Sequence, residues 1–134
     1  MLRRNERPGW APLGSAVLAA SLLAALGGCG ASETSKSQSS VNHLLAATQA
    51  LEGGDDAAAM QELTAAIDDA PNAWAYFKRA QLHLKGGNEA EANADCQKGL
   101  ELNEFNPDLK WLSGELKKPA AQRFKGRFAK APSG

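Results

Sequence analysis

Residues that carry metal or redox chemistry are scarce in this sequence of 134 residues, which holds only two cysteines and two histidines. His43 and His83 lie far apart in the chain, and no cysteine stands at metal-ligand spacing from either of them. The sequence also lacks a nucleophile elbow, a phosphate-binding glycine loop and a dinucleotide fingerprint. We therefore predict no metal site, no catalytic residues and no enzymatic activity.

An overall excess of one charge is absent as well, because 15 basic and 15 acidic side chains balance each other. The charges are nevertheless sorted along the chain: residues 32–109 carry a net charge of −8 and residues 110–134 a net charge of +6. An acidic body repels nucleic acid, so we exclude nucleic acid as a partner of the body. The basic end is expected to fold back on the acidic body or to meet an anionic surface elsewhere.

Apolar runs long enough to span a bilayer as a permanent helix are also missing. The longest, LGSAVLAASLLAAL, runs from Leu13 to Leu26 and has 14 residues. It follows a positively charged start that contains Arg3, Arg4 and Arg7. This combination is typical of a secretory signal peptide, and we assign residues 1–28 to one.

The residues after this run, Leu26-Gly27-Gly28-Cys29, resemble the lipobox of bacterial lipoproteins. The resemblance implies that Cys29 becomes the first mature residue and carries covalent lipid, while no other cofactor is implied. Several acyl chains on one residue would anchor the exported protein stably to a bacterial membrane. Gly30 follows in place of Asp, which favours the outer membrane, on its periplasmic side, in a cell with two membranes. A plain secretory signal or an uncleaved anchor helix is the alternative.

The Ser-rich stretch that follows is polar and cannot bury a core. We predict that residues 29–40 consist of the lipidated cysteine and a flexible tether, which lets the domain stand off the membrane.

Beyond residue 41, apolar residues recur at three- and four-residue spacing, which predicts helices. Residues 73–103, AWAYFKRAQLHLKGGNEAEANADCQKGLELN, resemble one tetratricopeptide repeat, a pair of antiparallel helices of about 34 residues. A fainter copy lies 33 residues earlier, at residues 41–71. The matching positions are Tyr76, Ala80, His83, Gly87, Ala92, Cys96, Gly99 and Leu100 in the clearer copy, and Ala47, Gly54, Ala59, Leu63, Ala66 and Ile67 in the fainter one.

The resemblance implies an all-α fold for residues 41–118, namely a short solenoid of the tetratricopeptide-repeat type. It consists of two helix-turn-helix repeats, about residues 40–72 and 73–106, and a capping helix at residues 106–118. Residues 119–134 form a basic tail, for which a disordered end is the leading interpretation. The alternative is a basic amphipathic segment that lies on anionic lipid or docks the rings of Phe124 and Phe128 on the acidic body.

In this family the first helix of each pair lines a concave groove, so the resemblance implies a site for a peptide or helix of a partner. The residues that it assigns to this groove are Leu44, Thr48, Trp74, Phe77, Gln81 and Trp111. Alternatively, the three aromatic rings only pack between the second repeat and the cap. The resemblance also pairs Arg79 with Asp95 as a structural salt bridge across the second repeat.

Together these features favour a membrane-anchored adaptor that binds a protein partner within an envelope complex. Five helices are fewer than three full repeats, however, and such units bury their faces only by stacking. The alternative function is therefore a structural lipoprotein that completes its stack by forming a homo-oligomer and acts as a spacer without a separate ligand.

Overall fold

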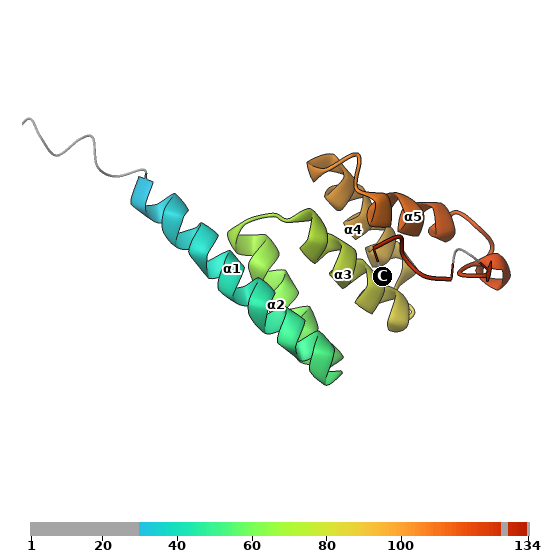
Figure 1. Cartoon of the computed structure of the whole chain (residues 1–134), viewed down its shortest axis with the longest axis horizontal. Helices are drawn as coiled ribbons and strands as arrows, with labels where there is room; N and C mark the ends of the chain where they lie inside the picture. Colours follow the sequence, from blue (N-terminus) through green and yellow to red (C-terminus); the bar gives the residue numbers. More distant parts are fainter. Residues whose placement is uncertain (1–29, 127–128, 134) are drawn as a thin grey trace, which may run out of the picture.

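The computed structural model describes residues 30–126 and 129–133, and every regular element in these residues is helical (Figure 1). The elements are α1 (Gly30–Gly53), α2 (Asp56–Asp69), α3 (Ala73–Lys85), α4 (Glu89–Leu102), α5 (Pro107–Leu116) and a short 3-10 helix (Ala120–Gln122). The fold class is therefore all-α, as the sequence predicts. The predicted signal peptide, Cys29 and Phe128 lie outside the described residues.

The helices form two antiparallel pairs, α1 with α2 and α3 with α4, and α5 lies beside α4 (Figure 1). Each pair is joined by a tight turn that needs a residue in the left-handed region, and glycine supplies it: Gly54 has a φ of 75° and Gly87 a φ of 81°. Asparagine side chains begin the next helices. Asn72 accepts hydrogen bonds from the first turn of α3, and Asn106 accepts one from Leu109 N–H at 3.0 Å.

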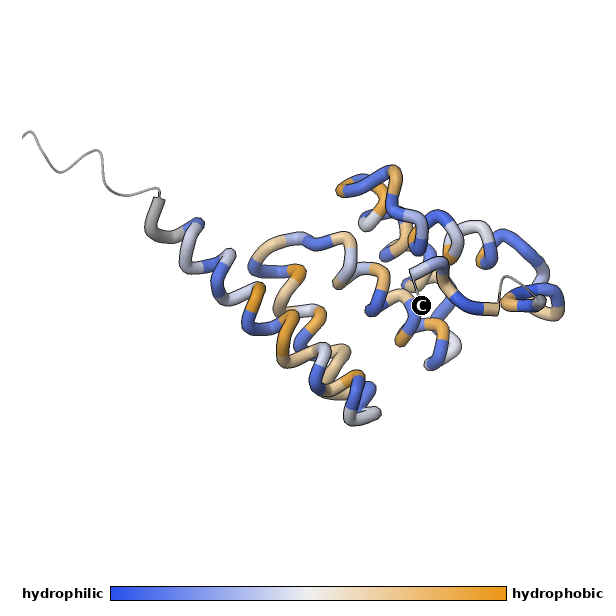
Figure 2. The backbone as a smooth tube through the Cα atoms, viewed as in Figure 1, coloured by the Kyte–Doolittle hydropathy of each residue, from blue (hydrophilic) through white to orange (hydrophobic). Residues whose placement is uncertain are grey.

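Helix α3 contributes to two separate core clusters, and this shared helix stacks one pair on the next. The first cluster joins α1, α2 and α3 through Ala47, Ala59, Leu63, Ile67, Ala75 and Leu82. The second joins α3, α4 and α5 through Phe77, Ala80, Ala92, Cys96, Leu109 and Leu112. Apolar residues gather where the helices lie side by side (Figure 2). A capping helix is thus needed to bury the far side of α3 and α4.

The prediction of a flexible tether is wrong for residues 30–40, which form the first part of α1. Once the packed part of α1 has formed, further residues add to it without a new nucleation step, even where serine is frequent. Ser40 is 3% exposed and its hydroxyl donates to the Ala66 carbonyl at 2.9 Å, which ties the junction to the end of α2. Residues 33–38 of α1 are exposed and hydrophilic (Figure 2).

The leading interpretation of the tail as disordered is also wrong for residues 119–126 and 129–133, which we call the tail segment. This segment leaves the end of α5, contains the 3-10 helix and returns toward α3 (Figure 1). Phe124 and Ala131 pack against the second core cluster. The basic end therefore folds back on the acidic body, one of the two outcomes that its charge predicts. Among the described helices, none is both long and apolar enough to cross a membrane.

Candidate functional site

The residues assigned to a concave groove divide into three groups in the structure. Phe77 is 3% exposed and belongs to the second core cluster. Its prediction as an exposed anchor is therefore wrong, because α5 closes over α3 in so short a stack and leaves the ring between three helices. For this ring, the packing alternative is the correct one.

Leu44 and Thr48, on α1, do not reach the other predicted residues of the groove. Leu44 packs against the first core cluster. Thr48 is half-buried, and its hydroxyl donates to the Leu44 carbonyl at 2.9 Å, a bond within the same helix. Neither residue lines any of the hollows described below. The candidate site is thus confined to the second helix pair, α5 and the tail segment.

Trp74 is 36% exposed in the first turn of α3, where its ring remains accessible. The Lys78 ammonium, one helical turn later, lies 5.8 Å from the centre of this ring and 5.4 Å from that of Phe77. Such placement of a cation over an aromatic face is attractive. The start of α3 therefore presents an accessible aromatic surface next to a positive charge.

Gln81 and Trp111 are brought together by α3 and α5, as the sequence predicts for a shared groove. Both are half-buried, and both line two neighbouring hollows on this side of the molecule. The first hollow, of about 330 Å³, is lined by Gln81, Leu84, Lys85, Trp111, Leu112 and Phe124. The second, of about 430 Å³, is lined by Phe77, Lys78, Gln81, Trp111, Ala129, Lys130, Ala131 and Ser133. We call this surface of α3 and α5 the α3–α5 face.

The tail segment thus supplies residues to both hollows, which sequence reasoning on helices alone missed. The Phe124 ring lies 5.6 Å from the Trp111 ring, at an interplanar angle of 54°. Tilted pairs at this distance are favourable aromatic contacts. The spacing of aromatic and basic residues in the tail was the available signal, but it did not say which surface the rings would meet.

A buried carboxylate holds the start of the tail segment. Glu115, on α5, is 2% exposed and accepts a hydrogen bond from the Phe124 backbone N–H at 2.7 Å. Its other oxygen is paired with the Lys118 ammonium. These two bonds, the one from Lys118 first, hold the pKa of Glu115 below its ordinary value. The carboxylate therefore stays ionised at neutral pH and binds the tail backbone.

The guanidinium of Arg123 ties the tail segment to two helices. It donates to the Glu89 carboxylate of α4 at 2.6 Å, and to the carbonyls of Lys118 at 2.7 Å and Leu116 at 3.1 Å. The bond from Arg123 lowers the pKa of Glu89. A planar guanidinium with several N–H donors can reach these three acceptor groups at once, which a lysine ammonium would do less well.

The predicted partners Arg79 and Asp95 lie together between α3 and α4. Arg79 donates from Nε to Asp95 Oδ2 at 2.8 Å and from Nη2 to Oδ1 at 2.7 Å, a forked pair, and from Nη1 to Thr64 of α2 at 3.2 Å. The bond to Asp95 raises the pKa of Arg79 further above its ordinary value. His83 lies 3.7 Å from the same carboxylate. These residues link three helices away from both hollows.

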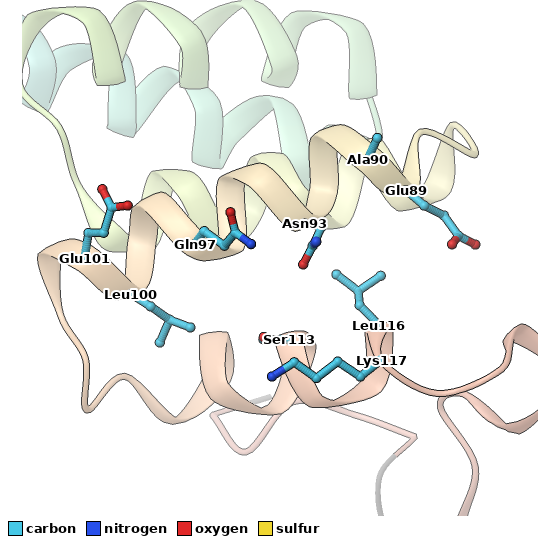
Figure 3. Close-up of a pocket in the computed structure, with 9 residues that line it drawn as sticks. All are labelled: Glu89, Ala90, Asn93, Gln97, Leu100, Glu101, Ser113, Leu116 and Lys117. Carbon is cyan, nitrogen blue, oxygen red and sulfur yellow. The ribbon is translucent and has the colours of Figure 1, made fainter.

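A third hollow, of about 760 Å³, lies between α4 and α5 and was not predicted. Its walls are the exposed side of α4 and the end of α5 (Figure 3). The residues that line it are Glu89, Ala90, Asn93, Gln97, Leu100, Glu101, Ser113, Leu116 and Lys117. The hollow mixes amides, both charges and two leucines, and is lined by no cysteine, histidine or tyrosine. It is an open, largely polar groove between two helices.

Reactive groups are few in the described part of the chain. Cys96 is fully buried, and burial raises the pKa of its thiol to about 12, so it is neither a nucleophile nor a ligand. Within residues 30–126 and 129–133, no three histidine, cysteine or carboxylate side chains cluster in a way that could hold a metal ion. The α3–α5 face can bind another molecule through its aromatic surface, its amide groups and its charges.

Neither a family model, nor a curated protein, nor a solved structure matches this chain.

Proposed function

We propose that this protein is a lipid-anchored adaptor of the tetratricopeptide-repeat type, which binds a segment of a protein partner on the α3–α5 face. One observation carries the proposal: Gln81 of α3 and Trp111 of α5 meet at two adjoining hollows, and the accessible ring of Trp74 lies about two turns before Gln81 on α3. Aromatic surface beside amide and charged groups is the usual composition of a protein-binding site.

The anchor in this proposal is the lipid on Cys29, with the chain exported and held at the periplasmic side of an outer membrane. The test is metabolic labelling with radioactive palmitate followed by membrane fractionation. The full chain should carry label and remain with the membrane, whereas Cys29→Ser should carry none. A labelled Cys29→Ser chain would refute the anchor but leave the binding site untouched.

Partner binding is tested by capture from envelope extract with the full chain as bait in detergent. Trp74→Ala and Gln81→Ala remove accessible groups and should each weaken capture of the same partner by about tenfold or more. Phe105→Ala is the matched control, since this ring is 74% exposed but follows α4, away from both hollows. Loss of capture by the control alone would place the site elsewhere.

A structural spacer is the second candidate, and a specific observation supports it. Val41 and Leu45 are 54% and 60% exposed and lie one turn apart on α1, at the open end of the stack. Under this proposal the full chain is an oligomer that Leu45→Lys dissociates, as sedimentation velocity in detergent would show. A monomeric wild type would exclude it.

A further inference from the structure

The α3–α5 face is already occupied by part of the chain itself. Phe124 of the tail segment forms part of the wall of the first hollow, and Ala131 and Ser133 form part of the wall of the second. Both Phe124 and Ala131 also pack against the second core cluster. A surface that accepts an extended segment of its own chain has the shape for such a segment from another protein.

The contacts of the tail segment show which chemistry this face accepts. Three carboxylates on the body receive it: Glu89 takes the Arg123 guanidinium, Glu115 takes the Phe124 N–H, and Asp108 takes the Ser133 N–H at 3.0 Å and the Ser133 hydroxyl. The ring contact with Trp111 is made by Phe124, the residue that directly follows Arg123. The tail segment thus combines bonds to carboxylates on α4 and α5, which border the face, with a ring contact to Trp111, and this combination suits a basic segment that carries an aromatic residue.

The backbone at Phe124 is held by these contacts and not by local preference. Its φ is 54°, in the left-handed region that bulky side chains rarely adopt. The hydrogen bond from the Phe124 N–H to Glu115 and the ring contact with Trp111 hold the residue in this conformation.

We infer that the α3–α5 face recognises a basic protein segment in which an arginine is directly followed by an aromatic residue, and that the tail segment occupies this face until such a partner displaces it. The inference rests on the proposed adaptor function and names the chemistry of the partner. Glu89 and Glu115 select the arginine and the backbone, and Trp111 selects the ring. Tail and partner compete for one site.

The test uses a fluorescent synthetic peptide of residues 119–134 as the probe and the full chain in detergent as the receptor. The receptor variant Arg123→Ala/Phe124→Ala frees the face, and circular dichroism verifies that its helices remain. Since a segment on a short linker has an effective concentration in the millimolar range, the wild type should bind the probe at least about tenfold more weakly than this variant. Arg123→Glu is a second receptor, which frees the tail through charge repulsion while keeping the ring.

Peptide controls separate recognition from general charge attraction. A peptide with Phe124→Ala, and a scrambled peptide of the same composition, should both bind the freed receptor at least about tenfold more weakly than the native sequence. Equal binding of the scrambled peptide, equal binding to wild type and freed receptors, or no binding at millimolar peptide would each overturn the inference. Envelope capture that fails while the native peptide binds would refute the adaptor function and not the recognition of the segment.

Discussion

The forked pair of Arg79 and Asp95 stabilises the second helix pair from within. The Arg79 side chain is only 18% exposed, so loss of the Asp95 charge leaves a largely buried guanidinium without its counter-ion. We expect Asp95→Asn to lower the free energy of unfolding by about 3 kcal/mol. Urea unfolding followed by circular dichroism measures this.

A surface pair supplies the control for this change. Lys98 and Glu101 are 3.5 Å apart with side chains that are 62% and 67% exposed, so Glu101→Gln should cost less than about 1 kcal/mol. Asp95→Asn should also leave partner capture by the folded protein unchanged. Lost capture at full stability would move Asp95 into the binding site.

Substitutions of Phe77 and Trp74, two aromatic residues of α3, should distinguish a role in packing from a role in binding. Phe77 is 3% exposed among residues of three helices, and Phe77→Ala should lower the free energy of unfolding by about 3–5 kcal/mol. Trp74 is 36% exposed, and Trp74→Ala should cost about 1 kcal/mol and act mainly on capture. Equal losses of stability in the two variants, measured by thermal unfolding, would contradict this assignment.

At the residue scale, the sequence predicts which side chains pair within one helix pair better than it predicts how exposed a single side chain is. Arg79 and Asp95 could be paired because both belong to one helix pair, whose internal geometry the repeat pattern specifies. The exposure of Phe77 depends instead on how closely α5 approaches α3, and that is set by small residues and by the packing of the cap. Helix periodicity alone does not contain this information.

The close approach of α4 to its neighbours depends on Gly99. A methyl group at this position would lie 2.6 Å from Leu109 Cδ1 and 3.2 Å from Tyr76 Cβ, whereas the same group at Gly114 of α5 would meet nothing within 4 Å. Both positions are helical, so alanine gains about 1 kcal/mol of helix propensity at each. At Gly99 overpacking by about 1–3 kcal/mol opposes that gain.

We therefore expect Gly114→Ala to raise the free energy of unfolding by about 1 kcal/mol, and Gly99→Ala to be less stable than Gly114→Ala by about 1–3 kcal/mol. Chemical denaturation of the two variants side by side measures the difference. Equal stabilisation by both substitutions would mean that α4 and α5 are packed more loosely at this point than the structure has them.

Element boundaries followed from local signals where those signals were strong. Helices end or begin at Gly54, Gly87 and Asn106. Glycine is the residue type that tight turns favour, and asparagine is one that helix starts favour, so the sequence specifies these boundaries. The start of α1 was not predictable in this way, because a polar serine-rich stretch fits both a tether and the exposed extension of a helix. The contact that decides, Ser40 with the end of α2, is distant in sequence.

At the scale of the whole molecule, the charge pattern predicted that the basic end could return to the acidic body, but not where. The location depends on Glu89, Glu115 and Trp111, which lie on different helices and come together only in the folded stack. Local composition made a disordered end the leading interpretation, since a short terminal segment rarely buries enough surface to hold itself. Here hydrogen bonds and ion pairs with specific carboxylates hold the tail segment, although it buries little apolar surface.

We therefore expect the docking of the tail segment on the body to weaken as the pH becomes acidic. The pKa of Glu115 lies below its ordinary value of 4.5 because Lys118 and the Phe124 N–H bind the ionised form, and Arg123 lowers that of Glu89 in the same way. The stabilisation is fully present above the ordinary value and is lost as the pH falls through the lowered one. Protonation of these two carboxylates weakens the bonds that hold Arg123 and the Phe124 N–H.

The Phe124 amide resonance in ¹H–¹⁵N spectra of residues 30–134 reports this release directly. Its shift should change with a midpoint below 4.5, the ordinary pKa of a glutamate, as the bond to Glu115 is lost. In Glu115→Gln the carboxylate is gone, so this transition should be absent and the tail should already be weakened at neutral pH. A midpoint at or above the ordinary value, or an unchanged transition in the variant, would show that the carboxylate does not hold the tail, and the exchange between tail and partner would then need another anchor.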